Sequence, residues 1–587
     1  MTTASTEAPP APKMTHRQVL EALSGLLLGM FVAILAGTVV STSLPRIVSD
    51  LNGDQTAYTW VVTGTLLATT VSTPIWGKLA DLFNRKLLIQ LSLVIFVIGS
   101  ALAGFSQDTN TLIIFRVLQG LGAGGLTALS QIIMADIISP RERGRYMGLF
   151  GGVMAVGTVG GPLIGGLLTD GFGWRWNFFV ALPVAIVAII LLQKTLHLPK
   201  VVKRVVSIDY LGAILIAGGV SLLLIWVSMA GNQFDWWSTT TAWMVGGAVV
   251  ALVLAVIVEL RAKEPILPMS LFKNRTFTLA VIASISVGVA MFGTSVYLAQ
   301  YMQLARGASP TESGLLTLPM IAGLLLSSTI IGNIISRTGV WKPYMIGGSI
   351  ALAIGLGLMG TIHYDTNYVL VSVYMLILGA GVGAVMQNLV LVVQNAVQPS
   401  ELGASSAGVA FFRSLGGTVG VSVMGAILAT RVSDSLAAST AQLQAALAKL
   451  GAEGAKIGEA LASGTIPKVS TLPDSVRPII ESAYGDGVAH VFLLAAPLAL
   501  VTILAIVFLP NLSLGTKTAL ERREESRLQE SEERVFDTAI ASIDGTPTGS
   551  IGVVRDGEKR DASAPAPASA SASGEHAADD TARRSGK

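Results

Sequence analysis

Long apolar segments recur along almost the whole chain, and short polar segments separate them. The apolar segments cover approximately residues 21–45, 57–79, 86–106, 111–138, 146–169, 176–195, 209–229, 240–260, 277–301, 313–336, 343–363, 368–396, 403–430 and 488–510. Each is close to the ~20 residues that an α-helix needs to cross the hydrocarbon core of a bilayer. The pattern therefore predicts an all-α polytopic membrane protein with about fourteen transmembrane helices.

Basic residues are concentrated in alternate short loops between these segments. The loops after the even-numbered segments hold Lys78, Arg85, Lys86, Arg141, Arg143, Arg145, Lys200, Lys203, Arg204, Arg261, Lys263, Lys273, Arg275, Arg337 and Lys342. The other short loops hold little beyond Arg46, Arg175 and Arg306. Because cytoplasmic loops carry the excess of Lys and Arg, we predict a multi-pass protein of the cell membrane with both termini in the cytoplasm.

The amino-acid composition argues against several classes of protein function. Hydrophobic residues make up 52% of the chain and charged residues 13%, which is too few for the surface of a soluble protein of this size. The absence of cysteine excludes disulfides and thiol–metal sites, and the five histidines are scattered without the spacing of a metal site. We therefore expect no enzyme, no cofactor and, with a net charge of only +3, no nucleic-acid partner.

The chain divides into halves that resemble each other. Four short motifs of the first half recur about 255–260 residues later in the same order, as when Pro140-Arg-Glu-Arg-Gly144 returns as Pro399-Ser-Glu-Leu-Gly403. The other pairs begin at Gly77 and Gly332, Leu118 and Leu378, and Gly157 and Gly417. Such an internal repeat is typical of transporters built from two parallel halves.

These observations predict five regions. In order, they are a cytoplasmic N-terminal tail (1–20), an N-terminal six-helix half (21–200), two inserted transmembrane helices (201–265), a C-terminal six-helix half (266–510) and a cytoplasmic, largely disordered tail (511–587). Within the second half, residues 431–487 form an extracytoplasmic loop. A short amphipathic helix is expected in this loop between Ser435 and Leu461, where Leu443, Leu447 and Leu450 have helical spacing.

Glycines mark one apolar segment in particular. Gly157, Gly161 and Gly165 recur every four residues, so on a helix they share one face, and Gly166 follows directly after them. A face without side chains allows a neighbouring helix to approach closely. Pro162 has no N–H group and is expected to bend this helix.

Three motifs together resemble a known family. Gly77-Lys-Leu-Ala-Asp-Leu-Phe-Asn-Arg-Lys86 resembles the signature loop of the major facilitator superfamily, Arg116-Val-Leu-Gln-Gly120 its fourth-span motif, and Gly157–Gly166 its antiporter motif. With about fourteen spans, the chain is similar to the drug:proton antiporter branch. The resemblance covers about residues 10–510 and implies a major facilitator fold with alternating access between the two halves.

The resemblance assigns a gate to the loop that begins at Gly77. Asp81 lies at the end of the second span, where it is expected to pair with Arg85 and Lys86 or to cap the N-terminus of a neighbouring helix. Either contact would hold one conformation closed. The alternative is that the basic residues only mark the cytoplasmic side of the membrane.

Two arginines fall inside apolar spans. An intramembrane arginine costs ~2.5–3.5 kcal/mol on insertion scales, so Arg116 is expected to face a polar cavity or a partner such as Gln119. Snorkelling to the nearby interface is the alternative for Arg116. For Arg413 in the thirteenth span, a cavity position and a packing position fit equally well.

The acid that the family carries in its first span is absent, because Ala36 stands in its place. Asp136, near the basic loop after the fourth span, is the substitute candidate for proton coupling, or it only caps that loop. With Arg116 and Arg413 as the deepest charges, a neutral or anionic substrate is expected rather than a cation. Polar residues that fit either the cavity wall or helix packing are Tyr297, Gln300, Tyr301, Gln303, Gln387, Asn388 and Gln394.

The leading hypothesis is a monomeric secondary active transporter in the lipid bilayer that exports amphiphilic drugs, antibiotics or secondary metabolites in exchange for protons. A first alternative is an exporter of lipid or cell-envelope components, which should depend on residues 431–487. A second alternative is a non-transporting membrane sensor that signals through residues 515–587. The sensor does not explain the motifs at Gly77–Lys86 and Gly157–Gly166.

Overall fold

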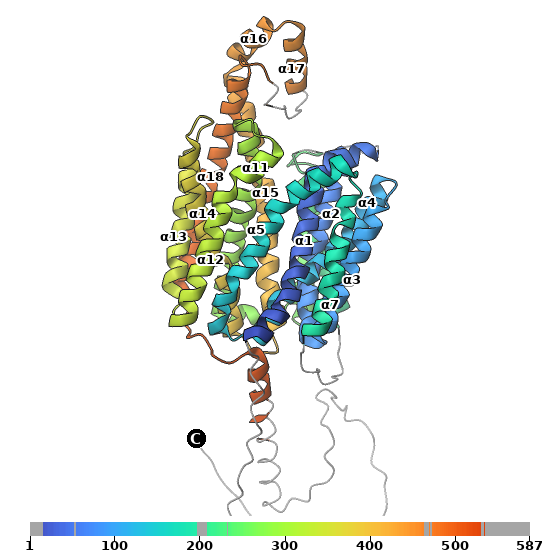
Figure 1. The fold of residues 1–587 in the computed structure, drawn as a ribbon, viewed down its shortest axis with the longest axis vertical. Coiled ribbons are helices and arrows are strands. Elements are labelled where there is room, and N and C mark those ends of the chain that lie inside the picture. Colours follow the sequence, from blue (N-terminus) through green and yellow to red (C-terminus); the bar gives the residue numbers. More distant parts are fainter. Residues whose placement is uncertain are drawn as a thin grey trace, which may run out of the picture. The chain divides into compact units, whose positions relative to one another are not determined.

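The computed structural model describes residues 16–51, 55–196, 208–231, 233–462, 469, 472–526, 528, 529 and 533. Its helices are α1 (His16–Asp50), α2 (Gln55–Leu82), α3 (Arg85–Gly104), α4 (Thr109–Ile137), α5 (Pro140–Gly171), α6 (Trp176–Phe179), α7 (Ala181–Thr195), α8 (Tyr210–Met229), α9 (Thr239–Glu259), η1 (Met269–Lys273), α10 (Arg275–Gln300), η2 (Tyr301–Ala305), α11 (Pro310–Leu316), α12 (Leu318–Thr338), α13 (Lys342–Met359), α14 (Tyr368–Ala396), α15 (Leu402–Ala438), α16 (Thr440–Lys449), α17 (Ala452–Ala462) and α18 (Arg477–Phe508). The arrangement is shown in Figure 1.

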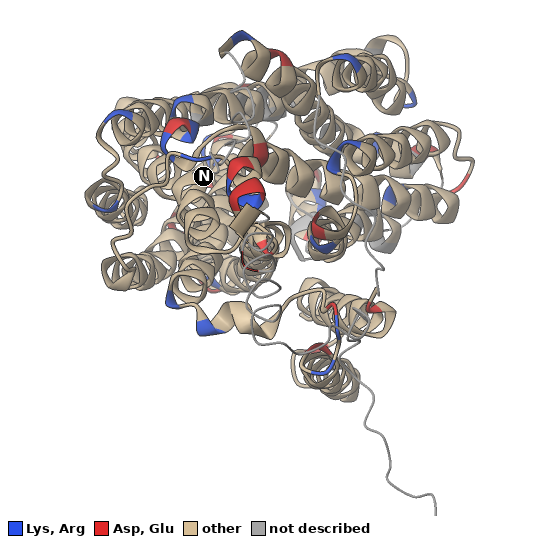
Figure 2. Cartoon of the chain, turned by 90° about the horizontal axis from the view of Figure 1, so that it is seen from below, with Lys and Arg blue, Asp and Glu red and all other residues tan. Residues whose placement is uncertain are grey.

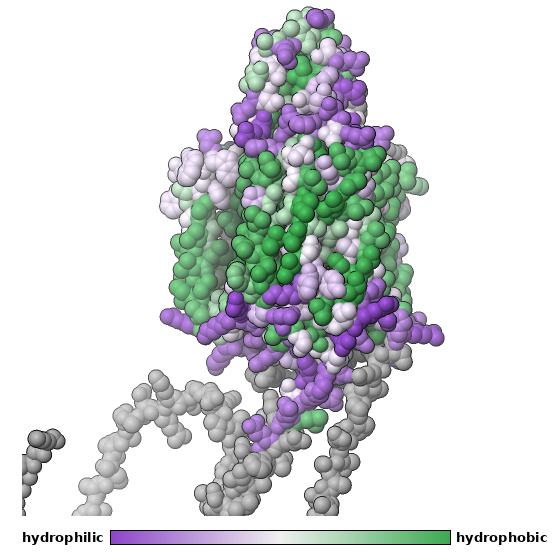
Figure 3. Space-filling model, turned by 90° about the vertical axis from the view of Figure 1, so that its left-hand side faces the viewer, coloured by the Kyte–Doolittle hydropathy of each residue, from purple (hydrophilic) through white to green (hydrophobic). Residues whose placement is uncertain are grey.

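The predicted membrane fold is confirmed. In the described part of the chain, 12 helical segments are long and apolar enough to cross a membrane. Helices α2 and α5, with 28 and 32 residues, are also long enough to cross, although α2 is less apolar because it is rich in threonine. Including these two gives the expected total of about fourteen. On the molecular surface, an apolar belt lies between polar bands at the two ends (Figure 3).

The internal repeat is visible in the packing of the helices. In the N-terminal half, α4 packs against α2 and α3, and α1 packs against α5 and α7. In the C-terminal half, α14 packs against α12 and α13, and α10 packs against α15 and α18. Each helix of one half thus has a counterpart in the other with the same neighbours, as the repeated motifs predict.

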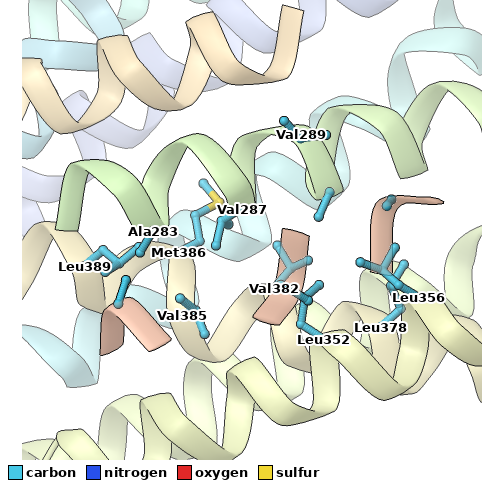
Figure 4. Packing of buried hydrophobic residues seen from close by; sticks show 14 of the residues in the cluster. Ala283, Val287, Val289, Leu352, Leu356, Leu378, Val382, Val385, Met386 and Leu389 are labelled. Atoms are coloured by element: carbon cyan, nitrogen blue, oxygen red, sulfur yellow. The ribbon is translucent and has the colours of Figure 1, made fainter. Parts of the chain in front are cut away.

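Each half has its own apolar core. The core of the C-terminal half contains Val287 of α10, Leu352 of α13, and Val382 and Leu389 of α14 (Figure 4). The N-terminal half buries an equivalent cluster around Phe96 of α3. The N-terminal cluster also includes Leu402 and Ala407 of α15, but the contacts between the halves are fewer than those within them, so the halves are able to move as units.

The halves meet along two seams that the repeat relates to each other. At the α2–α15 seam, α2 of the first half packs against α15 of the second, and at the α5–α12 seam, α5 packs against α12. The inserted helices α8 and α9 pack against each other, and α8 also packs on α2 and α15. Val71, Val220, Leu224 and Phe411 form a small apolar cluster where α8 covers the α2–α15 seam.

The two ends of the bundle differ. We call the end where α2, α4, α12 and α14 finish the basic end, because Lys78, Arg85, Arg141 and Arg143 lie there, and we call the opposite one the far end. Figure 2 views the molecule from the basic end and shows Lys and Arg residues at several helix ends. The far end carries α16 and α17, which lie beyond α15 and α18 (Figure 1).

The expected loop 431–487 is largely helical. Helix α15 continues to Ala438, and α18 already begins at Arg477, so both membrane helices extend well beyond the predicted spans. Two short helices, α16 and α17, replace the single amphipathic helix that was expected. They pack on each other and share a small apolar cluster with residues of α18, including Ile480.

Candidate gate and substrate site

The basic end of the α2–α15 seam contains a buried cluster of opposite charges. Asn84 caps α3 by accepting hydrogen bonds from two backbone N–H groups of its first turn, so Arg85 becomes the first residue of α3. Arg85 donates from Nε to the carbonyl oxygen of Ala80 (2.8 Å), from Nη2 to Oδ1 of Asp81 (3.3 Å) and from Nη1 to Asp136. All three charged side chains are at most 4% exposed. One guanidinium therefore lies between two carboxylates.

Asp81 also contacts the other half of the molecule. Its Oδ1 and Oδ2 accept hydrogen bonds from the backbone N–H groups of Gly403 (2.8 Å) and Ala404 (2.9 Å) at the start of α15. The N-cap residue of α15, Glu401, makes no side-chain cap of its own. The carboxylate of one half thus satisfies the N-terminus of a helix in the other half, where the helix dipole favours negative charge.

The predicted gate residues are only partly brought together. Gly77, Asp81 and Arg85 lie at the α2–α15 seam, but Lys86 points elsewhere and donates from Nζ to the carbonyl oxygen of Gln193 (2.8 Å). Of the two arrangements expected for Asp81, pairing with a base and capping a helix, the structure contains both.

Close glycine contacts hold both seams together at the basic end. A Cβ on Gly77 would collide with Ala407 and a Cβ on Gly403 with the carbonyl oxygen of Gly77, so α2 and α15 are in backbone contact. At the α5–α12 seam, Gly144 and Gly332 are related in the same way, each against the carbonyl oxygen of the other. These glycines belong to two of the repeated motifs, so the repeat places equivalent close contacts at both seams.

The two seams differ in charge. Ser336 stands in the second half where Asp81 stands in the first, and Arg141 donates to the carbonyl oxygens of Ser336 (3.4 Å) and Arg337 (3.0 Å). The α5–α12 seam therefore has no carboxylate equivalent to Asp81 in this place. Among the described residues, an ionic contact holds only the α2–α15 seam.

A second polar network between the halves involves Arg143 of α5, which is 1% exposed. Its Nη1 donates to Oε1 of Gln394 on α14, and its Nη2 donates to the carbonyl oxygens of Ala135 (3.4 Å) and Ile138 (3.0 Å). Gln394 in turn donates from Nε2 to Ser406 of α15 (2.8 Å). Gln394, expected at a cavity wall, is therefore part of the closed basic end.

In the sequence, Arg143 indicated only which side of the membrane its loop faces, and its contacts between the halves were missed. The signal that would have revealed its role is its place inside the repeated motif Pro140–Gly144, which adjoins one of the close glycine contacts.

The glycine face of α5 packs against α1 in the same half. A Cβ on Gly157 would lie 2.7 Å from the side chain of Ile34, and a Cβ on Gly161 would collide with Thr38. Thr38 donates from Oγ1 to the carbonyl oxygen of Gly157 (2.9 Å), and Ser43 donates to that of Gly165 (3.3 Å). A Cβ on Gly166 would meet nothing within 4 Å. Helix α5 continues through Pro162, whose side chain lies outside the described residues.

Arg116 is 4% exposed and bonded within the N-terminal half. Its Nη1 donates to Oε1 of Gln119 (2.6 Å), and its Nε lies 3.5 Å from the carbonyl oxygen of Val61 on α2. Gln119 donates to Ser100 of α3 (3.1 Å). The expected neighbour Gln119 is thus a direct partner, and Arg116 connects α4 to α2 and α3.

Arg413 of α15 differs from Arg116. It is 8% exposed, and its buried Nη1 has no hydrogen-bond partner among the described residues. On α14, which packs against α15, Oδ1 of Asn388 is likewise buried without a described partner, while its Nδ2 donates to the carbonyl oxygen of Ala384 (2.7 Å). Buried polar groups in native proteins are normally paired, so these two groups have unused capacity for a ligand.

Two of the other candidate cavity residues, Tyr297 and Tyr301, are engaged with backbone groups. The hydroxyl of Tyr297 donates to the carbonyl oxygen of Val421, and that of Tyr301 to the carbonyl oxygen of His363 (2.7 Å). Gln387 is 7% exposed, whereas Gln300 and Gln303 are half-buried. Tyr297 and Tyr301 therefore support packing in this conformation.

Ala36, which replaces the acid of the family's first span, is 1% exposed and belongs to the apolar core of the N-terminal half. A carboxylate at this position would be buried among apolar side chains. Asp136 is also 1% exposed, but it pairs with Arg85 at the basic end. Asp136, the substitute candidate for proton coupling, is thus in contact with the gate.

A cavity of about 280 Å³ lies beside the α2–α8 contact near the basic end. Its walls come from Ile75, Lys78, Leu79, Leu82, Ile208, Asp209, Tyr210, Ala213, Glu264 and Ile266. Lys78 is paired there with Glu264 (Nζ–Oε2 2.7 Å). Neither Arg116 nor Arg413 lines this cavity, so it is not the expected substrate site.

Comparisons with known proteins agree with the fold and with the family resemblance. The family model described as the Major Facilitator Superfamily matches residues 26–421. Multidrug transporter protein MdtP of Bacillus subtilis (strain 168) is 33% identical over 530 residues, which cover 88% of this chain and 97% of that protein. Multidrug resistance protein 3 of the same organism is 30% identical over 499 residues, or 85% and 96% of the two chains. The structure of the proton:xylose symporter XylE matches with a TM-score of 0.53 at 14% identity, covering 87% of this chain and 99% of that one.

Proposed function

Because the chain belongs to the Major Facilitator Superfamily, and is therefore a membrane transporter rather than an enzyme, we propose that it exports small amphiphilic compounds across the cell membrane by proton antiport. The relatives named as multidrug transporters support drugs, antibiotics or secondary metabolites as the substrate class. The positions of the basic loops support an orientation in which the basic end and both termini face the cytoplasm.

The observation that carries this proposal is the duplicated contact between the halves at the basic end. Gly77 with Gly403 and Gly144 with Gly332 close the two seams at equivalent positions, and Asp81 adds an ionic contact to one of them. Two cores joined by such contacts form a two-state element, in which one end closes while the other opens. This arrangement supports alternating access.

The proposed coupling site is the cluster of Asp81, Arg85 and Asp136. Two carboxylates share one guanidinium, so protonation of one carboxylate leaves a neutral pair with Arg85. If the proton binds Asp81, the hydrogen bonds to Gly403 and Ala404 weaken and the seam is free to separate. Proton binding and opening of the basic end are then linked.

The proposed substrate is neutral or anionic. Arg413 has an unpaired buried Nη1, and in the described part of the chain neither it nor Arg116 contacts a carboxylate. A negatively charged group on the substrate would relieve the cost of the unpaired guanidinium at Arg413, whereas a cation would be repelled.

The test uses purified protein in liposomes with an imposed pH gradient and a fluorescent amphiphile inside the compartment that corresponds to the cytoplasm. We expect efflux that stops when an uncoupler collapses the gradient and that is absent from protein-free liposomes. Efflux that is unaffected by the uncoupler would exclude proton antiport. Absence of efflux across a panel of neutral, anionic and cationic dyes would exclude the amphiphile exporter.

A further inference from the structure

The C-terminal segment after α18 is bound to the basic end. We call residues 509–525 the strap. The sequence predicts a largely disordered tail from residue 511, but the structure packs residues 511–525 against the bundle, and most of the chain after 525 lies outside the described residues. The strap becomes helical at Ala519, where Thr518 and Glu521 form reciprocal hydrogen bonds between side chain and backbone (2.6 and 3.2 Å).

The first part of the strap is held by the C-terminal half. Trp341, which is 1% exposed, donates from Nε1 to the carbonyl oxygen of Leu512 (2.8 Å). Asn395 at the end of α14 donates from Nδ2 to the carbonyl oxygen of Ser513 (3.0 Å) and accepts from the N–H of Gly515 (2.9 Å). These bonds fix an extended piece of backbone to α13 and α14.

The strap then crosses to the N-terminal half. The carbonyl oxygen of Gly515 accepts a hydrogen bond from the N–H of Arg141 in the first turn of α5 (3.2 Å). Ala519 is fully buried in the apolar cluster of the N-terminal half, which also includes Leu402 and Ala407 of α15. Residues of the strap therefore contact both halves within a few positions of each other.

The strap also reaches the gate itself. Arg523 donates from Nε and Nη2 to the carbonyl oxygen of Pro399 (3.1 and 2.5 Å), just before α15. Its Nη2 lies 3.9 Å from Oδ1 of Asp81. A cation supplied by the strap thus lies beside the carboxylate that closes the α2–α15 seam.

We infer that the strap is a built-in lock of the basic end: residues 509–525 stabilise the closed state by bridging the two halves, and they have to release one half before this end opens. A segment bonded to Asn395 in one half and to Arg141 in the other cannot keep both sets of contacts when the halves separate. The inference rests on the proposed alternating access, but not on the substrate or the coupling ion.

Two truncations of the full chain separate the strap from the rest of the tail. One ends after Glu525 and keeps the strap, and the other ends after Pro510 and removes all of the strap except its first two residues. Because the chain has no cysteine, Leu87→Cys and Val340→Cys introduce a single pair of labelling sites. Leu87 on α3 and Val340 before α13 are 63% and 46% exposed and lie at the basic end of different halves. Distances between spin labels at these sites report opening without any transport.

We expect the truncation after Glu525 to give the distances of the full chain, and the truncation after Pro510 to shift the ratio of closed to open molecules by about tenfold toward open. Equal distance distributions in the two truncations would overturn the inference. Because this readout needs no substrate, a failure of the exporter proposal would leave it unaffected.

A point variant in the full chain provides an independent test in case the shorter truncation misfolds. Ala519→Asp in the full chain places a charge in the buried contact with the N-terminal half and should reproduce the shift toward open. Lys517→Ala is the matched control, because Lys517 is 57% exposed and pairs with Glu525 inside the strap. Unchanged distances in Ala519→Asp, or equal shifts in both variants, would contradict the lock.

Discussion

Two buried arginines in this transporter have opposite environments. Arg116 is bonded to Gln119 and reaches Val61, whereas Arg413 keeps an unpaired Nη1. A guanidinium that is satisfied inside its own half serves packing, and one with unused donors is available to a ligand. The sequence indicated both as intramembrane charges, but only their contacts separate the two roles, because the residue type and the apolar context are the same.

Arg413→Ala is predicted to weaken the export of anionic compounds selectively. A hydrogen bond to a charged group contributes ~1.5–3 kcal/mol, so the apparent affinity for an anionic dye should fall by roughly 10- to 150-fold, while that for a neutral dye changes little. Efflux from liposomes over a range of dye concentrations measures both. Arg413→Lys should retain part of the preference for anions. An equal loss for both dyes would show that Arg413 only packs.

Arg116→Ala is predicted to act through stability. It leaves the buried Oε1 of Gln119 without its donor, which costs ~1–3 kcal/mol. The midpoint of thermal unfolding in detergent should fall, and the double variant Arg116→Ala with Gln119→Leu should recover part of the loss because both polar partners are then absent. A normal unfolding midpoint together with abolished efflux would instead assign Arg116 to the transport path.

Asp81→Asn is predicted to loosen the closed basic end. The substitution removes the charge that pairs with Arg85 and caps α15, and charge-assisted hydrogen bonds contribute about twice as much as neutral ones. Spin-label distances between Leu87→Cys and Val340→Cys should shift toward open, and proton-driven efflux should fall at least about tenfold. Asp50→Asn at the far end, where Asp50 lies 44% exposed beside Arg46, is the control and should change neither.

At the scale of single helices, hydrophobic periodicity and glycine spacing predicted the membrane helices and a close contact between two of them. The apolar segments gave the membrane helices, and the four-residue spacing of Gly157 and Gly161 indicated a close helix contact, which the structure places between α5 and α1. The pattern was not able to indicate which helix is the partner, because any neighbour fits a face without side chains. It also missed that α15 and α18 extend beyond the bilayer-length segments, since a helix continues into water where tertiary contacts support it.

Gly161→Leu is predicted to destabilise the N-terminal half strongly. A leucine there collides with Thr38 of α1, and overpacking of this kind costs ~1–3 kcal/mol or more. Gly166→Leu on the same helix is the matched control, because a Cβ there meets nothing within 4 Å. Thermal unfolding and efflux per inserted molecule should both drop in the first variant and stay near normal in the second. Equal behaviour of the two would mean that α1 and α5 do not depend on this contact.

For the molecule as a whole, removal of the far-end helices α16 and α17 distinguishes between two classes of substrate. Replacing residues 439–472 by a short Gly/Ser linker should leave efflux of small amphiphiles within about twofold, because these helices pack on their own cluster outside the two cores. An exporter of lipid or cell-envelope components should depend on them. Loss of export from a protein that still inserts and unfolds normally would favour that alternative.

The overall architecture followed from the sequence, and the strap did not. Two repeated halves were visible as motifs that recur in the same order, because the repeat preserves the residues at equivalent helix contacts. The strap was read as part of a disordered tail, since residues 511–525 are short, polar and outside the repeat. Its order comes from hydrogen bonds to partners far away in the chain, such as Trp341 and Asn395, and no local pattern records them.

The position of the inserted pair has a consequence for how the bilayer acts on the transporter. Helix α8 packs on α2 and α15, and in the described part of the chain no comparable inserted pair packs on α5 and α12. We therefore expect lipid tails to reach the α5–α12 seam, while α8 covers the α2–α15 seam. The lateral pressure and the hydrophobic thickness of the bilayer should then influence opening of the transporter mainly at the α5–α12 seam. The membrane would therefore affect the two sides of the transporter unequally during the transport cycle.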